Sequence, residues 1–355
     1  MIKFGLAAGT NVGLVRTNNE DNFVVNSDLT QGAWTLPQSA TPVELGPYGS
    51  LLVVADGMGG ANAGEVASAI AIETIQQVIA PDALKEALPI DTEGGAISDD
   101  DVVRFMCDAI KTADINIVNR SKTDSSTRGM GTTIVMAWVL QDKAYVAWCG
   151  DSRCYLFNEN SGLIRLTKDH SYVQDLVDAG KLDEENAFDH PYSNIITRCL
   201  GDQERRAEPD ARVYTLHGSD VLLLCSDGLH GLCRDEVIML IVSDYSTDMQ
   251  ACRDALIQSA LDAGGHDNVT VALCRIDVTD SASATPLNTT LPVNPTPHHL
   301  GLWLLALVVA LIVGAFCFTP AGEWLNRFAP ADTLMQVSAD TNLVDSVAPA
   351  VPDTR

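Results

Sequence analysis

The chain has 355 residues, of which 47 are acidic and 22 are lysine or arginine, so its formal net charge is −25. This charge argues against a nucleic-acid-binding protein, which needs a basic surface, and against docking on anionic lipid head groups. Hydrophobic residues make up 46% of the chain, which is enough for the core of one large domain or of two small ones.

The cysteines and the N-terminus indicate the compartment. The nine cysteines are odd in number, are scattered, and include no Cys-x-x-Cys pair. This usage is typical of reduced thiols in a cytosol. The first residues, Met1 to Leu6, contain no long apolar segment, so we expect no secretory signal.

Strand-like and helical patterns alternate along the first part of the chain. Apolar residues recur at helical spacing from Glu65 until Pro81 interrupts them, and a second helical pattern follows an acidic, glycine-containing stretch. In chain order we expect strands at 2–10 and 22–26, an irregular surface insertion at 27–49, a strand at 51–55, a helix at 65–80, a loop at 82–100 and a helix at 101–120.

The middle of the chain is rich in strand-like runs. Two pairs of these runs are each separated by a short turn, which is typical of β-hairpins. Residues 171–189 are polar, and we expect this segment to begin as a helix, to continue as irregular chain and to form a mobile flap. Further elements are expected as strands at 132–140, 143–149, 154–157, 163–166, 212–216, 221–225 and 269–277, and as helices at 234–242 and 249–263. This order favours central sheets with helices outside them.

The composition shifts after residue 278. Residues 279–299 are dominated by Ser, Thr, Pro and Asn and are typical of a linker. The 19 residues 300–318 carry no charge, and a segment of this length is long enough for a transmembrane helix. Trp303 and Trp324 lie where interfacial aromatic residues belong. A buried core helix is the alternative, although the position after a linker argues against it. Residues 319–355 have the composition of a disordered tail.

Four acidic residues stand where apolar, strand-like runs end or begin, close to glycine. Asp56 ends the run 51–55 and is followed by three glycines within four positions. Asp227 and Asp151 follow two other runs, and Asp267 precedes the run that starts at residue 269. A strand that is apolar throughout is covered on both faces, so it delivers its terminal acid to the edge of a buried sheet.

These acids allow two interpretations. A single Asp-Gly at a strand end is commonly a turn residue, and this alternative holds for each one taken alone. A group of carboxylates is tolerated when divalent cations neutralise it, and a ligand set made only of oxygen selects magnesium, manganese or calcium. Four such acids in one chain favour the metal site.

Seven motifs then occur in order. They are Arg16-x-x-Asn19-Glu20-Asp21, Asp56-Gly57-Met58-Gly59-Gly60, Gly129-Met130-Gly131-Thr132-Thr133, Gly150-Asp151-Ser152-Arg153, Leu166-Thr167-Lys168-Asp169-His170-Ser171, Ser226-Asp227-Gly228 and Asp267-Asn268. Together they resemble the metal-dependent protein phosphatase family, type 2C, in its bacterial form. The resemblance covers residues 3–277. It implies an α+β fold for residues 1–278, an α-β-β-α sandwich of two central antiparallel sheets flanked by helices.

The resemblance also implies roles for particular residues. Asp56 bridges two Mn²⁺ or Mg²⁺ ions, which lower the pKa of the attacking water between them. The other implied positions are the carbonyl of Gly57 and the carboxylates of Asp227 and Asp267 as metal ligands, Glu20 and Asp21 as holders of metal-bound water, Asp151 as a ligand of a third ion, and Arg16 as the residue that holds the substrate phosphate. Arginine suits this last role because its planar fork reaches two phosphate oxygens.

The chain departs from the family in two places. Met58 stands where eukaryotic members carry a histidine that is considered the general acid, and methionine has no proton to donate. Bacterial relatives have a serine near the flap that helps to bind the third metal ion. Here Asn194 stands at that position, one residue after Ser193.

Other polar residues have simpler interpretations. For Arg153 we favour an ion pair that holds the Asp151 loop over contact with the substrate. Cys199 and Arg205 have the spacing of cysteine-dependent phosphatases, but two acids between them oppose that chemistry. The histidines show no metal-binding spacing, so surface or packing roles are expected for His170, His190, His230 and His266.

The hypothesis from the sequence is a phosphoserine/phosphothreonine protein phosphatase that opposes a Ser/Thr kinase. The alternatives are an inactive, phosphatase-like membrane scaffold and a hydrolase of small phosphate esters. We expect a single-pass protein of the inner (cytoplasmic) membrane, anchored through residues 300–318, with its catalytic domain in the cytoplasm. Arg327 after the span opposes this orientation, and the thiols and the N-terminus favour it.

Overall fold

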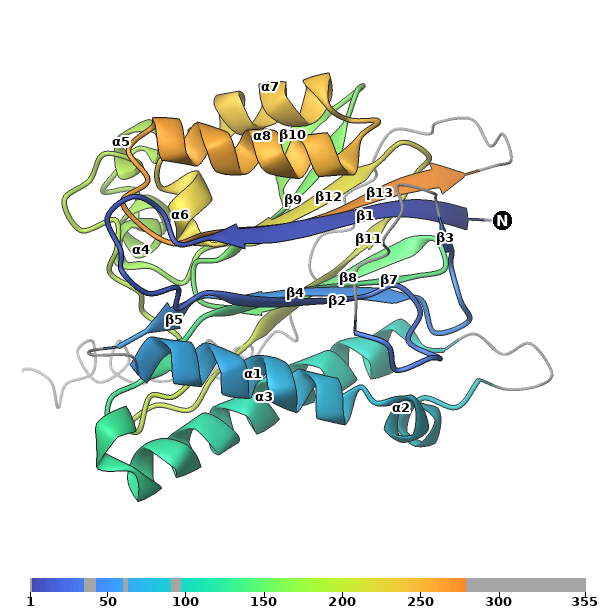
Figure 1. Ribbon diagram of the computed structural model, residues 1–355, viewed down its shortest axis with the longest axis horizontal. Coiled ribbons are helices and arrows are strands. Elements are labelled where there is room, and N and C mark those ends of the chain that lie inside the picture. The colour runs from blue at the N-terminus through green and yellow to red at the C-terminus, as the bar shows by residue number, and fades with distance from the viewer. Residues whose placement is uncertain (1, 35–42, 60–62, 91–96, 279–355) are drawn as a thin grey trace, which may run out of the picture. The chain divides into compact units, whose positions relative to one another are not determined.

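Two antiparallel β-sheets pack face to face between two layers of helices. The computed structural model describes residues 2–34, 43–59, 63–90 and 97–278. Figure 1 shows α7 and α8 over one sheet and α1 and α3 over the other. The predicted α-β-β-α sandwich is confirmed for this part of the chain.

The strands form three groups. The first sheet has the order β10-β9-β12-β13-β1-β3, the second has the order β11-β8-β7-β4-β2, and β5 pairs with β6. The strands are β1 Ile2–Asn11, β2 Asn22–Asn26, β3 Val43–Glu44, β4 Ser50–Ala55, β5 Gly57–Met58, β6 Gly131–Thr132, β7 Ile134–Leu140, β8 Lys143–Cys149, β9 Arg153–Asn158, β10 Gly162–Arg165, β11 Asp210–Thr215, β12 Val221–Cys225 and β13 Val269–Val278.

The helices cover the outer faces of the sheets and surround one end of the sandwich. They are α1 Ala63–Val78, α2 Pro81–Ala87, α3 Asp99–Thr123, the 3₁₀ turn Ser125–Thr127, α4 Tyr172–Asp178, α5 Glu184–Ala187, α6 Asp227–His230, α7 Asp235–Asp244 and α8 Met249–Asp262. Among the described residues, none of these helices combines the length and the apolar character that a membrane crossing requires.

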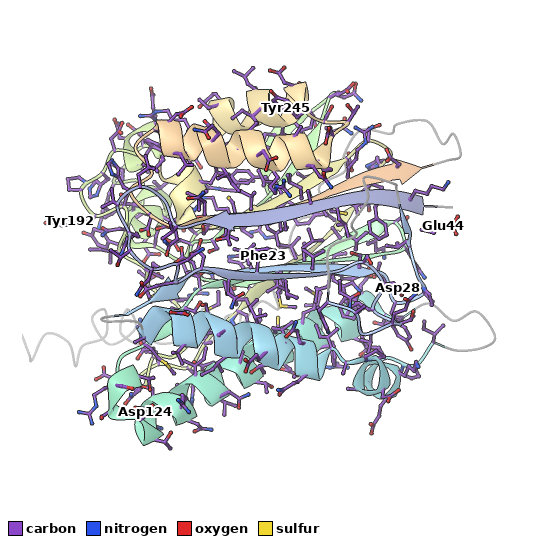
Figure 2. All side chains as sticks on the ribbon, in the orientation of Figure 1. Phe23, Asp28, Glu44, Asp124, Tyr192 and Tyr245 are labelled. Carbon is purple, nitrogen blue, oxygen red and sulfur yellow. The ribbon has the colours of Figure 1, made fainter. Side chains whose placement is uncertain are left out.

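The continuous apolar runs of β4 and β12 are explained by burial on both faces. In β4, Leu52 and Val54 point into the core between the sheets, whereas Leu51 and Val53 point toward α1 and α3. In β12 the same alternation joins the core between the sheets to the core beneath α7 and α8. Phe23 of β2 packs against the core between the sheets (Figure 2).

The prediction of a loop at 82–100 is wrong in part, because α2 occupies the beginning of this stretch. Pro81 opens this helix, a position where its missing N–H is not needed, and Leu84 is fully buried. The insertion predicted at 27–49 contains the short strand β3. The linker, the membrane helix 300–318 and the tail lie outside the described residues and stay predictions.

Candidate active site

Strand ends bring the predicted acids together at one end of the sandwich. β12 runs antiparallel to β13 and β9, and its last residue is paired with residues near the beginnings of both. Asp227 follows β12, Asp267 precedes β13 and Asp151 precedes β9, so all three meet at this edge. In Figure 1 it is the end at which α4, α5, α6 and β5 lie.

The second sheet supplies Asp56. The last residue of β4 is paired with the first residue of β2, which places Asp56 beside Glu20 and Asp21. The Gly57 N–H donates to the carbonyl of Glu20 at 3.2 Å. A Cβ on Gly57 would lie 2.5 Å from that oxygen, so the close approach of these two segments requires glycine.

The carboxyl groups of Asp56 and Asp227 lie within hydrogen-bonding distance of each other. Although solvent reaches part of both side chains, burial raises the pKa of Asp56 well above its usual range, and the charges of Asp21, Asp227 and Asp151 raise it further. Burial and Asp267 raise the pKa of Asp227, and burial and Asp227 raise that of Asp151. The folded chain therefore holds several like charges that oppose one another's ionisation.

Asp21 is buried behind this group and is held by two hydroxyls. The Ser226 Oγ donates to its Oδ2 at 2.8 Å and the Thr270 Oγ1 donates to the same oxygen at 2.7 Å. Burial raises the pKa of Asp21 to about 7, although both hydrogen bonds favour the charged form. Ser226 follows β12, and Thr270 lies in β13. The two central strands of the first sheet therefore fix this acid.

Arg16 forms an ion pair with Asp267, with 2.7 Å between Nη2 and Oδ2. The Arg16 side chain is 51% exposed. A guanidinium has five N–H donors, so the remaining donors can face a ligand while Asp267 holds the group in place. The structure thus brings together the predicted phosphate-binding residue and one of the predicted metal ligands.

Two histidines hold the loop that carries Asp151. The Gly150 N–H donates to the Nδ1 of His170 at 3.1 Å, and the His230 Nε2 donates to the carbonyl oxygen of Asp151 at 3.1 Å. Because its Nδ1 accepts, neutral His170 carries its proton on Nε2, which lies 3.2 Å from the Oδ2 of Asp210. The loop is therefore held at the N–H of Gly150 and at the carbonyl of Asp151.

For His170 and His230 the structure agrees with a packing role, one of the two roles that were expected. Both are buried and both bond to the backbone of the Asp151 loop. Burial lowers the pKa of His230 to about 3, so its ring is neutral near pH 7. The only signal in the sequence is that His170 lies in one of the motifs, because neither contact leaves a spacing pattern.

The interpretation of Arg153 as an ion-pair partner is confirmed. Its Nε and Nη2 donate to the carboxylate of Asp169, with the shortest distance 2.7 Å, and its Nη1 donates to the hydroxyl of Tyr155 at 3.0 Å. Asp169 immediately precedes His170, so this ion pair ties the beginning of β9 to the segment that holds the Asp151 loop.

The hydroxyl of Thr133 joins the two sheets at the site. It accepts from the Asp56 N–H at 3.2 Å and lies 2.7 Å from the Oγ of Ser152. The Thr133 N–H in turn donates to the carbonyl of Asp56 at 2.8 Å. One side chain therefore links the backbone of Asp56 to the residue after Asp151, a contact that sequence reasoning did not identify.

A pocket of about 870 Å³ opens beside the acids. Asp151, Asp227 and Asp267 line it together with the flap, residues 171–194, which includes α4 and α5. Ser193 and Asn194 both line this pocket, so the flap offers a hydroxyl and an amide.

The alternative based on Cys199 is not supported. Burial and the charge of Asp202 raise the pKa of the Cys199 thiol to about 11, so it is protonated near pH 7. A cysteine nucleophile needs the opposite shift, because the thiolate is the reactive form.

The acid cluster fits hard divalent cations. The Oδ1 of Asp151 is buried and has no hydrogen-bond partner in the part of the chain that the structure describes. The potential metal-ligand atoms around it are oxygens, which suit Mg²⁺ or Mn²⁺. Within the same residues no three acidic, histidine or cysteine side chains are grouped closely enough to hold one ion by themselves.

Comparison with known proteins agrees with this geometry. The model of the family described as protein phosphatase 2C matches residues 38–263. The serine/threonine phosphatase stp of Listeria monocytogenes is 34% identical over 270 residues, which are 76% of this chain and 95% of the relative.

Solved structures give the same result. The crystal structure of the Mycobacterium tuberculosis serine/threonine phosphatase PstP/Ppp has a TM-score of 0.61 and 30% identity, and the match covers 78% of this chain and 100% of that one. The catalytic domain of PstP in complex with two manganese ions matches with a TM-score of 0.59 and 28% identity, over 78% of this chain and 100% of that one.

We expect His170→Asn to preserve Mn²⁺ binding and His170→Phe to weaken it. The Oδ1 of asparagine stands where Nδ1 stands in histidine and can accept from Gly150, whereas phenylalanine keeps the ring and leaves that N–H unsatisfied, at a cost of about 1–3 kcal/mol. Mn²⁺ affinity by electron paramagnetic resonance and unfolding by urea measure the two effects. If the ring only fills space, Phe will be tolerated better than Asn, which would contradict the assigned role.

We expect Asp56→Asn to stabilise the metal-free protein by about 1–2 kcal/mol at pH 7.5. An aspartate in the unfolded chain loses its proton near pH 4, whereas folded Asp56 keeps it to a higher pH. The wild type therefore loses stability as the pH rises above about 4, and the asparagine variant does not lose this contribution.

Thermal unfolding in EDTA across this pH range measures the effect of Asp56→Asn. The control is Glu159→Gln, an exposed acid in the turn between β9 and β10, whose unfolding temperature should stay within error of the wild type. A lower unfolding temperature for Asp56→Asn at pH 7.5 would show that the charge at this position is already compensated.

Proposed function

This chain belongs to the protein phosphatase 2C family, and we propose that it hydrolyses phosphoserine and phosphothreonine in proteins by a metal-dependent reaction. The observation that carries the proposal is the group of opposed carboxylates at the strand ends. Carboxylates whose pKa values are raised by burial and by neighbouring acids, at the edge of a pocket, are typical of functional sites.

The proposed metal ligands are those that the family resemblance implies. Asp56, the carbonyl of Gly57, Asp227 and Asp267 would hold two ions, and Asp151 would bind a third. Glu20 and Asp21 would hold water next to them, since Asp21 is already fixed by its two hydroxyl donors. The bound ions supply neutralisation of charge and activation of water, as is usual for a two-metal site.

The chain's own residues bind and orient the substrate. Arg16, held by Asp267, would donate to two oxygens of the phosphate and align it with the acids. Met58 lies in β5 beside Gly131 and has no proton for the leaving alkoxide. The histidines that fix the Asp151 loop are engaged with the backbone, so water or another group has to protonate the leaving group.

Two alternatives are weaker. An inactive scaffold is expected to lack at least one of the acids, and this chain has all four strand-end acids in one place. A hydrolase of small esters is compatible with the same acids. The names of the relatives, serine/threonine phosphatases, favour a phosphoprotein substrate.

We further propose a Ser/Thr kinase as the opposing enzyme, and anchoring in the cytoplasmic membrane through residues 300–318, with the catalytic domain on the cytoplasmic side. The charge-free segment and the linker before it support the anchor. The eight cysteines among the described residues are all free thiols, which supports a reducing compartment.

The activity test uses the full chain and a phosphothreonine peptide. We expect phosphate release with Mn²⁺, loss of release in EDTA, and recovery when Mn²⁺ is restored. Asp227→Asn should lower kcat at least about 100-fold, and Arg16→Lys should raise KM about tenfold because lysine lacks the bidentate fork. Glu159→Gln is the control. Activity that survives EDTA or Asp227→Asn would contradict the proposal, and faster hydrolysis of nucleotides than of phosphopeptides would favour the small-ester alternative.

The membrane proposal is tested by fractionation and cysteine labelling in cells. We expect the full chain in the membrane fraction, extraction by detergent but not by salt, and a soluble chain when residues 300–318 are deleted. A cysteine introduced at residue 340 should react with an impermeant maleimide from outside the cell. Labelling of a cysteine at position 159 instead would reverse the proposed orientation.

A further inference from the structure

Two neighbouring apolar side chains beside Arg16 are largely exposed. Leu14 is 68% and Val15 is 62% exposed, the two highest values among large apolar residues in the described part of the chain. They lie in the connection from β1 to β2, which runs around the end of the sandwich that carries the acids (Figure 1). Single exposed apolar residues are common, whereas an adjacent pair at the edge of a site calls for a ligand.

The backbone under this pair is fixed. The Leu14 N–H donates to the carbonyl of Gly265 at 2.7 Å, and the side-chain amide of Asn268 donates to the carbonyl of Val12 at 2.9 Å. Gly13 has a φ of +80°, and a Cβ there would lie 2.3 Å from the carbonyl oxygen of Asp267. The exposed side chains are therefore presented by a rigid turn packed on the segment that carries a site acid.

The turn stands at a fixed place relative to the phosphate-binding residue. Val15 directly precedes Arg16, whose guanidinium is held by Asp267. Consecutive residues of an extended peptide advance about 3.3–3.6 Å. A phosphorylated residue bound at Arg16 therefore brings its immediate neighbours in the polypeptide over Leu14 and Val15.

The pocket of about 870 Å³ beside the acids has a different character, and neither Leu14 nor Val15 lines it. Its lining is rich in charged side chains, among them Glu184 of the flap and Asp235 and Glu236 of α7. Apolar side chains of a bound polypeptide are disfavoured beside these charges and favoured beside Leu14 and Val15. The apolar pair is therefore distinct from the charged lining of the pocket.

We propose that Leu14 and Val15 form an apolar subsite for a side chain next to the phosphorylated serine or threonine of the substrate. This inference rests on the proposed phosphatase function and adds a substrate preference to it. Leu14 lies over Gly265, so the subsite has a floor as well as an exposed surface. A substrate side chain bound there contacts Leu14 and Val15 and leaves the ion pair between Arg16 and Asp267 intact.

The test uses the full chain and two phosphothreonine peptides that differ only at the residues on either side of the phosphothreonine, leucine in one and serine in the other. We expect the wild type to favour the leucine peptide about tenfold in kcat/KM, the size that a methylene or two in an apolar site provides. The double variant Leu14→Ser/Val15→Ser should lose this preference, and Leu14→Met/Val15→Ile should keep it. Leu240→Ser removes a side chain of α7 that is 60% exposed, and should keep it too.

The outcomes distinguish a failure of the subsite from a failure of the proposed function. Equal kcat/KM of the wild type for both peptides overturns the subsite, as does a double serine variant that keeps the preference or a Leu240→Ser variant that loses it. Hydrolysis of 4-nitrophenyl phosphate by the wild type is measured in parallel. A wild type that hydrolyses neither peptide nor this ester overturns the proposed function itself, whereas activity without preference overturns only the subsite.

Discussion

The mutual repulsion of buried carboxylates is the constraint on which the rest of this structure depends. Asp227 raises the pKa of both Asp56 and Asp151, Asp151 raises that of Asp56 as well, and burial acts in the same direction on all three. An arrangement of this kind lowers the stability of the folded chain unless cations compensate it. The contacts around the site hold the acids in place despite this repulsion and keep them positioned for a cation.

The sandwich tolerates the repulsion because strands, not loops, deliver the acids. β4 and β12 are buried on both faces, so their apolar contacts hold the strand ends in place against the charges. Antiparallel pairing brings the end of one strand beside the beginning of the next. Hydroxyls and histidines then fix Asp21 and the Asp151 loop without adding charge, since His230 is neutral.

The strand ends could be predicted from the sequence, and the contacts that hold them could not. An unbroken apolar run followed by Asp-Gly is a local pattern, so β4 and β12 and their acids were identified correctly. The helix α6 begins at Asp227 itself and has four residues, too few to show a period. The ion pair of Arg16 joins residues 251 positions apart and the His230 contact spans 79, and no spacing encodes such pairs.

The charges of the chain also decide where selectivity for a substrate can arise. A phosphoserine carries about −1.5 to −2 charges near pH 7, and it approaches a protein with a formal net charge of −25. Bound cations and Arg16 can overcome this repulsion only at the phosphate, which is the same group in every phosphoprotein. Discrimination between phosphoproteins therefore has to come from the residues that flank it. Beside Arg16 those residues meet Leu14 and Val15, whose apolar contacts do not depend on charge.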